Sequence, residues 1–212
     1  MNTSIPQSSV PMLEARAITC VRGERELFSE LNLQLSPGEC LHIRGENGVG
    51  KTSLLRLLSG LASPESGEVL WNGTPIQKEA SEYHSKLLFL GHRDALKEDL
   101  TALENLLMYA AIDDIPVSEE EALASLWQFG LKGREDLSVH YLSAGQKKRV
   151  LMARILTRHA QLWILDEPFN ALDTQAGHEL QSLIGAHLAN RGLVVLTSHQ
   201  PLAIPNLRVL DL

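Results

Sequence analysis

Residues 45–53, GENGVGKTS, combine glycines, one lysine and two hydroxyl side chains at a spacing that suits phosphate binding. They match G-x-x-x-x-G-K-[ST], in which the backbone wraps phosphate oxygens and the amides of the following helix point toward them. Lys51 supplies positive charge for the β- and γ-phosphates, and the Thr52 hydroxyl is suited to ligate Mg²⁺. The alternative is a glycine-rich loop with an incidental lysine. The predicted nucleotide-binding residues are Gly45, Glu46, Asn47, Gly48, Val49, Gly50, Lys51, Thr52 and Ser53.

Two adjacent carboxylates, Asp166 and Glu167, follow the apolar run LWIL at residues 162–165. Open α/β sheets bind ligands at the carboxyl ends of their strands, so we expect both carboxylates near the phosphates. Asp166 is predicted to hold Mg²⁺ directly or through water, and Glu167 to orient or deprotonate an attacking water. Read without the phosphate loop, the pair is equally typical of solvated charge before a turn.

A second helix start lies in LSAGQKKRVLMARIL, residues 142–156. Ser143 and Gln146 match a capping box. Ala144 and Gly145 leave little bulk there, so the helix start presents amides and a hydroxyl suited to an anion. A well-capped helix with no functional role is the alternative interpretation.

The elements that would position these residues alternate between apolar runs and helical patterns, which predicts an α/β fold with a largely parallel sheet. Leucines at helical spacing predict a helix over residues 51–60, ended by Gly60. Several of the runs are apolar throughout, as expected for strands buried on both faces. The predicted strands cover residues 39–45, 67–73, 86–91, 162–166, 193–198 and 207–212.

The pattern between His92 and Ala160 is helical throughout, with capping boxes at Thr101–Glu104 and Ser118–Glu121. We therefore predict a helical subdomain over about residues 93–158, inserted into one domain spanning residues 13–212. Residues 1–12 are predicted to form a flexible tail.

Composition excludes some classes of function. The formal charge of −7 and the pI near 5.6 argue against a nucleic-acid partner. The two cysteines, Cys20 and Cys40, have no metal-binding spacing. No apolar run approaches the ~20 residues that cross a bilayer, so any membrane role is expected to depend on a partner.

These motifs, in this order, resemble the ATP-binding cassette (ABC) family. Residues 142–146 are similar to its LSGGQ signature, and residues 170–173, ending in Asp173, are similar to its D-loop. His199 ends a predicted strand where the family places its switch histidine, and His92 lies at the Q-loop position. The resemblance implies a P-loop NTPase core with an inserted helical subdomain and an N-terminal β-rich portion.

The resemblance also implies a homodimer or paired cassettes that sandwich two ATP molecules head to tail. Each ATP would lie between the phosphate loop of one protomer and the signature of the other, and the catalytic residues would be Glu167, His199 and Lys51, with Mg²⁺ held by Thr52 and Asp166. The implied signature residues are Leu142, Ser143, Ala144, Gly145 and Gln146.

Three positions depart from the family pattern. His92 stands where most cassettes have glutamine, and a solvated loop histidine is the alternative there. Arg22 stands where most have an aromatic that stacks on adenine, although a guanidinium plane can also stack on a base. Ala144 replaces a glycine, which costs little if the backbone there is helical.

Within the family, the LGH segment, residues 142–156 and the segment EVLWNGTPI look like the ATPase subunits of the cytochrome c maturation, or haem exporter, system. That resemblance implies a peripheral protein on the cytoplasmic face of a bacterial inner membrane. It implies integral membrane subunits as partners and ATP-driven release of a haem-loaded chaperone. The alternatives are the ATPase of another small ABC exporter, or a soluble ABC-type scaffold without transport.

Overall fold

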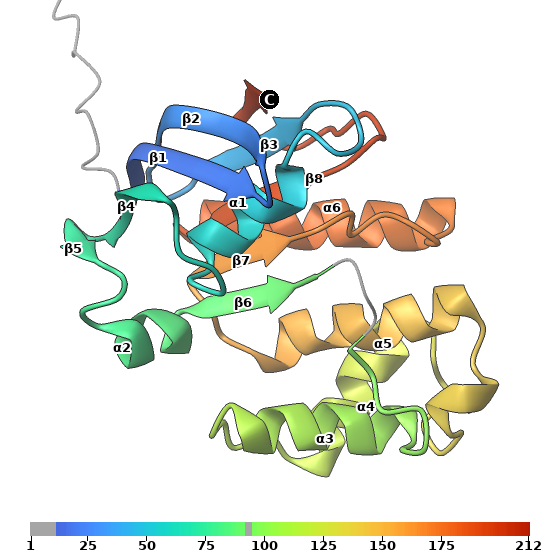
Figure 1. Ribbon diagram of the computed structural model, residues 1–212. Coiled ribbons are helices and arrows are strands. Elements are labelled where there is room, and N and C mark those ends of the chain that lie inside the picture. Colours follow the sequence, from blue (N-terminus) through green and yellow to red (C-terminus); the bar gives the residue numbers. More distant parts are fainter. Residues whose placement is uncertain (1–11, 92–94) are drawn as a thin grey trace, which may run out of the picture.

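A computed structural model describes residues 12–91 and 95–212 of the chain. Its central sheet is wholly parallel, with the strand order β6-β7-β8-β3-β9 (Figure 1). Every residue of β7 and β8 is buried, which confirms the sequence-based prediction of a parallel sheet covered on both faces. The strands of this sheet are β3 (Cys40–Arg44), β6 (Leu87–Leu90), β7 (Leu162–Leu165), β8 (Leu193–Thr197) and β9 (Leu207–Asp211).

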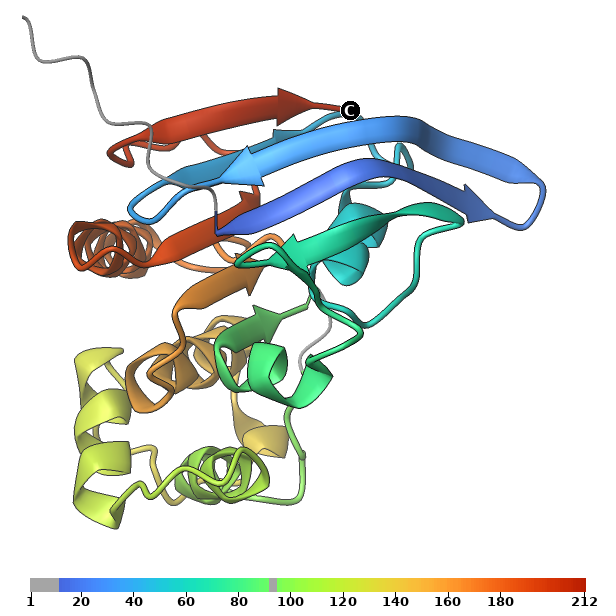
Figure 2. The same cartoon turned by 90° about the vertical axis from the view of Figure 1, so that its left-hand side faces the viewer.

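A second, antiparallel sheet with the order β2-β1-β4-β5 lies beside the parallel one (Figure 2). Helix α1 (Lys51–Leu58) buries its leucines in a core cluster shared by residues of both sheets. Gly60 follows the helix at φ 74°, as expected for its terminating residue. The strands of the second sheet are β1 (Leu13–Arg22), β2 (Arg25–Leu35), β4 (Ser66–Trp71) and β5 (Thr74–Pro75).

Between β6 and β7 the chain forms helices that gather below the parallel sheet (Figure 1). Asn105 of α3 is fully buried and accepts from Lys97 N at 2.8 Å, so its side chain fixes the loop before the helix. The three predicted capping boxes, at Thr101, Ser118 and Ser143, are all confirmed. These elements are α3 (Ala102–Ile112), α4 (Glu119–Gln128), the 3₁₀ turn η1 (Val139–Tyr141) and α5 (Ala144–Thr157).

Two further helices complete the fold. α6 (Thr174–Ala189) lies between β7 and β8 in the chain and buries Leu180 and Ile184 in the same cluster as the helices below the sheet. The short α2 (Ala80–Ser85) precedes β6, and its Tyr83 hydroxyl donates to Leu58 O at 2.5 Å. This contact ties α2 to the end of α1.

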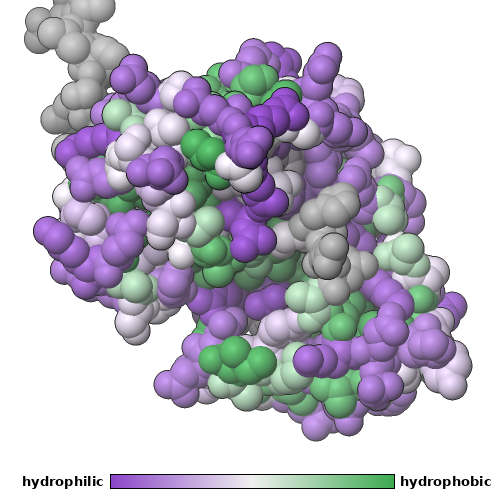
Figure 3. All heavy atoms as spheres, in the orientation of Figure 1, coloured by the Kyte–Doolittle hydropathy of each residue, from purple (hydrophilic) through white to green (hydrophobic). Residues whose placement is uncertain are grey.

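The surface is mainly hydrophilic on the face shown in Figure 3, where apolar residues form separate patches. Within residues 12–91 and 95–212, none of the helices is both long and apolar enough to cross a membrane. The predicted tail lies outside the described residues except for Met12, whose amide donates to Leu35 O at 2.9 Å.

Candidate functional site

The predicted phosphate loop connects β3 to α1, and its glycines adopt conformations that other residues reach only with strain. Gly45 has φ 147°, and a Cβ there would lie 2.8 Å from Leu212 O. Gly50 has φ 118° and a Cβ there would lie 3.2 Å from the Phe28 ring. Gly50 is also the N-cap of α1, so no side chain caps the amides at this helix start within the described structure.

Lys51 is the first residue of α1, and its side chain extends back along the loop. Its Nζ donates to Gly45 O at 2.7 Å and to Glu46 O at 3.0 Å, which holds the ammonium beside the loop backbone. The loop, Lys51 and the carboxylates after β7 line one open cleft of about 530 Å³. A cleft of this size, lined by the loop and by the positively charged Lys51, suits a phosphate-bearing ligand.

A chain of hydrogen bonds joins the ends of three elements under this cleft. Thr52 Oγ1 donates to Asp166 Oδ2 at 2.8 Å, and Thr197 Oγ1 donates to Asp166 Oδ1 at 2.8 Å. The Thr197 hydroxyl in turn accepts from Glu167 N at 2.8 Å. Since β8 lies between β3 and β7, Thr197 at its end fixes both carboxylate residues relative to the loop.

Glu167 carries two marks of a functional carboxylate. Its backbone has φ 49°, a conformation that costs free energy in a residue with a side chain and that is often found at active sites. Its Oε1 is buried and has no hydrogen-bond partner among the described residues, although His199 Nε2 lies 3.4 Å away. The side chain of His199 is 56% exposed, so the pair lies at the border of the cleft.

The oxygen ligands that Thr52 and Asp166 offer fit Mg²⁺ only if phosphate oxygens complete the coordination of the ion. In the part of the chain that the structure describes, no group of three or more His, Cys, Asp or Glu side chains could hold a metal ion. One hydroxyl and one carboxylate, Thr52 and Asp166, are within hydrogen-bond distance of each other. Magnesium sites in nucleotide-binding proteins have this composition, because the substrate supplies further oxygens.

The predicted signature, residues 142–146, forms the start of α5 away from the phosphate cleft. Ser143 is the N-cap, and Ala144 is the first residue of the helix, which meets the condition for its mild effect. Ser143, Gly145 and Gln146 line a separate hollow of about 360 Å³, and among the described residues it shares none of its lining with the phosphate cleft. Hence these residues and the phosphate loop face different spaces within one chain.

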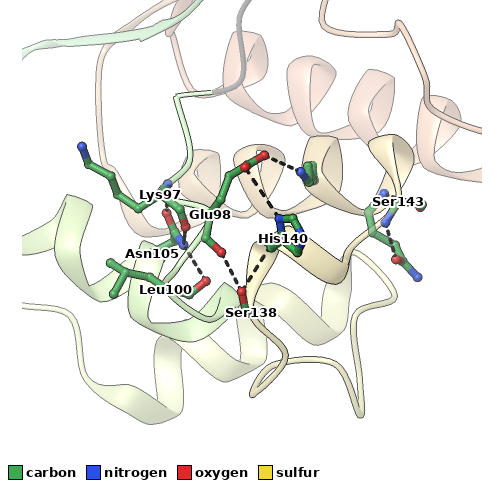
Figure 4. Close-up of polar contacts among 9 residues, drawn as sticks. Lys97, Glu98, Leu100, Asn105, Ser138, His140 and Ser143 are labelled. Atoms are coloured by element: carbon green, nitrogen blue, oxygen red, sulfur yellow. Dashed lines mark hydrogen bonds and ion pairs between the residues drawn. The ribbon is translucent and has the colours of Figure 1, made fainter.

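The chain entering the signature is fastened to the loop before α3 (Figure 4). The Ser138 hydroxyl donates to Glu98 O at 2.6 Å, and the His140 amide donates to the same carbonyl at 3.0 Å. The Glu98 carboxylate accepts from Lys147 Nζ of α5 at 2.8 Å, and this hydrogen bond holds the pKa of Glu98 below its ordinary value. Glu98 therefore holds both the segment before α5 and the first turn of α5.

Arg22 and His92 are the remaining predicted positions. Arg22, the last residue of β1, lines the phosphate cleft together with Leu27 of β2. His92 lies outside the described residues.

Sequence reasoning missed two polar residues at these sites. Thr197 was part of a predicted strand, but its role depends on the placement of β8 beside β7. Arg149 of α5 donates to Phe129 O at 2.9 Å and pairs with Asp173. In the sequence, Arg149 is marked only as a basic residue shortly after a capped helix start. Such residues are common on exposed helices, so this feature does not predict a contact with Asp173.

Comparison with known proteins gives consistent matches. The family model described as "ABC transporter" matches residues 28–170. The chain is 50% identical over 194 residues to the cytochrome c biogenesis ATP-binding export protein CcmA of Dechloromonas aromatica, covering 92% of this chain and 95% of that protein. It is 47% identical over 198 residues to the protein of the same name from Escherichia coli K12, covering 93% and 94%.

Solved structures give the same result for the fold. A putative ABC transporter ATP-binding protein from Pyrococcus furiosus has a TM-score of 0.81 and 26% identity, covering 94% of this chain and 96% of that one. A dimeric ATP-binding cassette in a post-hydrolysis state, bound to ADP and Pi, has a TM-score of 0.77 and 26% identity, covering 89% and 88%. The predicted P-loop α/β fold is confirmed by these structures.

Proposed function

The chain belongs to the ABC transporter family, and we propose that it is the ATP-hydrolysing subunit of a bacterial cytochrome c maturation, or haem exporter, complex. As a member of this family it is an ABC-type ATPase. The proposal of a pathway rests on relatives that are 45–50% identical over most of the chain and are named cytochrome c biogenesis ATP-binding export proteins.

The observation that carries the proposed chemistry is the buried Glu167 oxygen that has no hydrogen-bond partner in the described structure and lies beside the phosphate loop. A water molecule between Glu167 Oε1 and the γ-phosphate would attack the γ-phosphorus through the water oxygen. Glu167 would accept the proton that this water loses. The bond from the γ-phosphorus to the bridging oxygen breaks, leaving ADP and inorganic phosphate. His199, 3.4 Å from Glu167 Oε1, would keep the carboxylate and the phosphate in line.

The phosphates themselves would be held by Lys51 and by the amides at the start of α1. Thr52 and Asp166 would hold Mg²⁺, which neutralises charge on the phosphate oxygens when bound. Arg22, at the edge of the same cleft, would stack its guanidinium on the base, and His92 would occupy the Q-loop position.

Two copies would complete two ATP sites. Because residues 142–146 line a hollow separate from the phosphate cleft, the start of α5 would serve the nucleotide held by a partner cassette. ATP would bridge the two protomers through positive helix ends, and hydrolysis would remove the bridge. A solved relative in a dimeric state with ADP and Pi supports this arrangement.

The proposed partners are integral membrane subunits that hold the cassettes on the cytoplasmic face of the inner membrane. The ATP cycle would drive release of a haem-loaded chaperone. The sequence has no Cys-x-x-Cys-His motif for covalent haem attachment.

The test is an affinity pull-down of tagged Glu167→Gln from detergent-solubilised membranes with Mg-ATP, read by mass spectrometry and haem absorbance. This variant is expected to bind ATP and to accumulate as a nucleotide-bound dimer, because it lacks the proton acceptor. Integral membrane subunits together with a haem-bearing chaperone support the full proposal. Membrane subunits without haem contradict the pathway, and recovery of ribosomal proteins alone contradicts transport. The matched control is the wild-type protein with Mg-ADP.

A further inference from the structure

The D-loop, residues 170–173, packs directly on the start of α5. A Cβ at Gly145 would lie 2.9 Å from Ala171 O, so the two backbones meet without room for a side chain. Ala171 has φ 63°, which turns its carbonyl out of a regular path. Both segments line the same 360 Å³ hollow. The D-loop and the signature of one chain therefore form one surface.

Arg149 of α5 connects this surface to the end of α4. Its Nη1 donates to Phe129 O at 2.9 Å, immediately after α4, and its Nη2 donates to Asp173 Oδ2. The Arg149 side chain is only 20% exposed, so its charge depends on these two acceptors. A guanidinium can satisfy two such acceptors at fixed angles, which a lysine cannot do.

Asp173 has a second task in the same contact. Its Oδ1 accepts from Ala176 N at 2.9 Å and so caps α6. The Ala176 amide, followed by the Arg149 guanidinium, holds the pKa of Asp173 below its ordinary value. The carboxylate therefore stays ionised at neutral pH and fixes the end of the D-loop on both α5 and α6.

We propose that Arg149 is a positioning residue that links the two ATP sites of a cassette pair through the D-loop. In one protomer, α5 would contact the nucleotide held by the partner, while Glu167 acts on the protomer's own nucleotide. Residues 168–172 are the whole connection between Glu167 and Asp173. Through Arg149, a phosphate that fixes α5 also fixes the D-loop and, with it, the backbone at Glu167.

This inference rests on the proposed pairing of two ATP-hydrolysing cassettes. It predicts positive cooperativity in ATP, because binding at one site orders the catalytic carboxylate of the other. Coupling between sites is commonly about 5–150-fold in affinity, and the Hill coefficient of a two-site assembly has an upper bound of 2.

The experiment compares ATP hydrolysis against ATP concentration for the full-length wild-type chain, Arg149→Gln, Arg149→Lys and Asp173→Asn. Asn is as good an N-cap as Asp, so Asp173→Asn removes the ion pair and keeps the cap of α6. Arg208→Gln is the matched control, since Arg208 also donates to a carbonyl, Gln34 O at 2.7 Å, and to a carboxylate, Glu39 at 3.1 Å.

We expect a Hill coefficient above 1 for the wild type and for Arg208→Gln. For Arg149→Gln, Arg149→Lys and Asp173→Asn we expect a value near 1, with binding of a first ATP changed less than about 3-fold, since none of them keeps both hydrogen bonds of the guanidinium. The double variant, Arg149→Gln with Asp173→Asn, is expected to have the same Hill coefficient as either single variant, because both substitutions remove the same ion pair. A merely structural role predicts lower thermal stability and unchanged cooperativity instead.

The outcomes separate the two proposals. A wild type that does not hydrolyse ATP contradicts the proposed function itself. A wild type that hydrolyses ATP without cooperativity overturns only the inference. The inference is also overturned if the wild type is cooperative and Arg149→Gln keeps the same Hill coefficient. It is overturned too if the two substitutions lower the Hill coefficient additively in the double variant.

Discussion

Replacing Thr197 by valine tests whether β8 positions the two carboxylate residues. The Thr197 side chain is fully buried, and its hydroxyl both donates to Asp166 Oδ1 and accepts from Glu167 N. The valine side chain has the same shape but can neither donate nor accept a hydrogen bond. The variant therefore leaves one buried acceptor and one buried donor without partners, while the packing volume is kept.

The expected cost follows from these two groups. Each buried polar group left unpaired costs about 1–3 kcal/mol, so the free energy of unfolding is expected to fall by about 2–6 kcal/mol. In a chain of this size, each 1 kcal/mol lowers Tm by about 2–4 °C, so a Tm decrease of at least about 4 °C is expected. A displacement of Glu167 by about 1 Å would lower kcat about 100-fold.

The assays are thermal unfolding followed by circular dichroism and steady-state phosphate release at saturating Mg-ATP, measured below the Tm of the variant. Thr197→Ser is the control, because it keeps the hydroxyl and loses one buried methyl group, worth about 1 kcal/mol. We expect Thr197→Ser to retain kcat within about threefold, since a loss of that size corresponds to under ~1 kcal/mol of barrier. A Thr197→Val protein with the kcat and Tm of the wild type would refute the positioning of Glu167 by β8.

Two other regions give direct predictions. Gly145→Ala is expected to hydrolyse ATP at least about 10-fold more slowly, because the new Cβ would lie 2.9 Å from Ala171 O and would push the start of α5 away from residues 170–173. Gly185→Ala, in α6 with no atom of the described residues within 4 Å of the new Cβ, is the control for ATPase assays, and equal rates in both variants would contradict the close contact. Cys40 is fully buried, and burial raises its pKa to about 12, so at pH 8 about one thiol in ten thousand is ionised. Iodoacetamide at pH 8 should therefore spare Cys40 in the folded chain and modify it in guanidinium chloride, and rapid alkylation of the folded protein would show that this core is open.

Local sequence signals predicted much of the fold. The strands buried on both faces are short apolar runs, so their composition alone marks them, as for β7 and β8. Capping boxes need only residues three apart, and all three were found. The predicted phosphate loop is also a local signal, because its nine residues are consecutive.

Features that depend on long-range placement could not be read from the chain. β1 and β2 are long strands with bulges and mixed burial, so only a β-rich N-terminal portion was foreseen, without its strand limits or pairing. Their registers shift between Ala15 and Ile18, which breaks the alternation that marks a strand. The roles of Thr197 and Arg149 arise from contacts with residues far along the chain, Asp166 and Asp173 included.

The order of strands in the parallel sheet has a consequence for biosynthesis. β3, which leads into the predicted phosphate loop, pairs with β8 and β9 alone among the described strands, and both are made more than a hundred residues later. A Cβ at Gly45 would lie 2.8 Å from the carbonyl oxygen of Leu212, the residue directly after β9. During translation, α3, α4 and α5 can form while β3 still has no neighbour. A nascent chain that stops before β8 therefore lacks both strand partners of β3 and lacks Thr197, so we expect it to hold neither the predicted phosphate loop nor Asp166 in place and to hydrolyse no ATP.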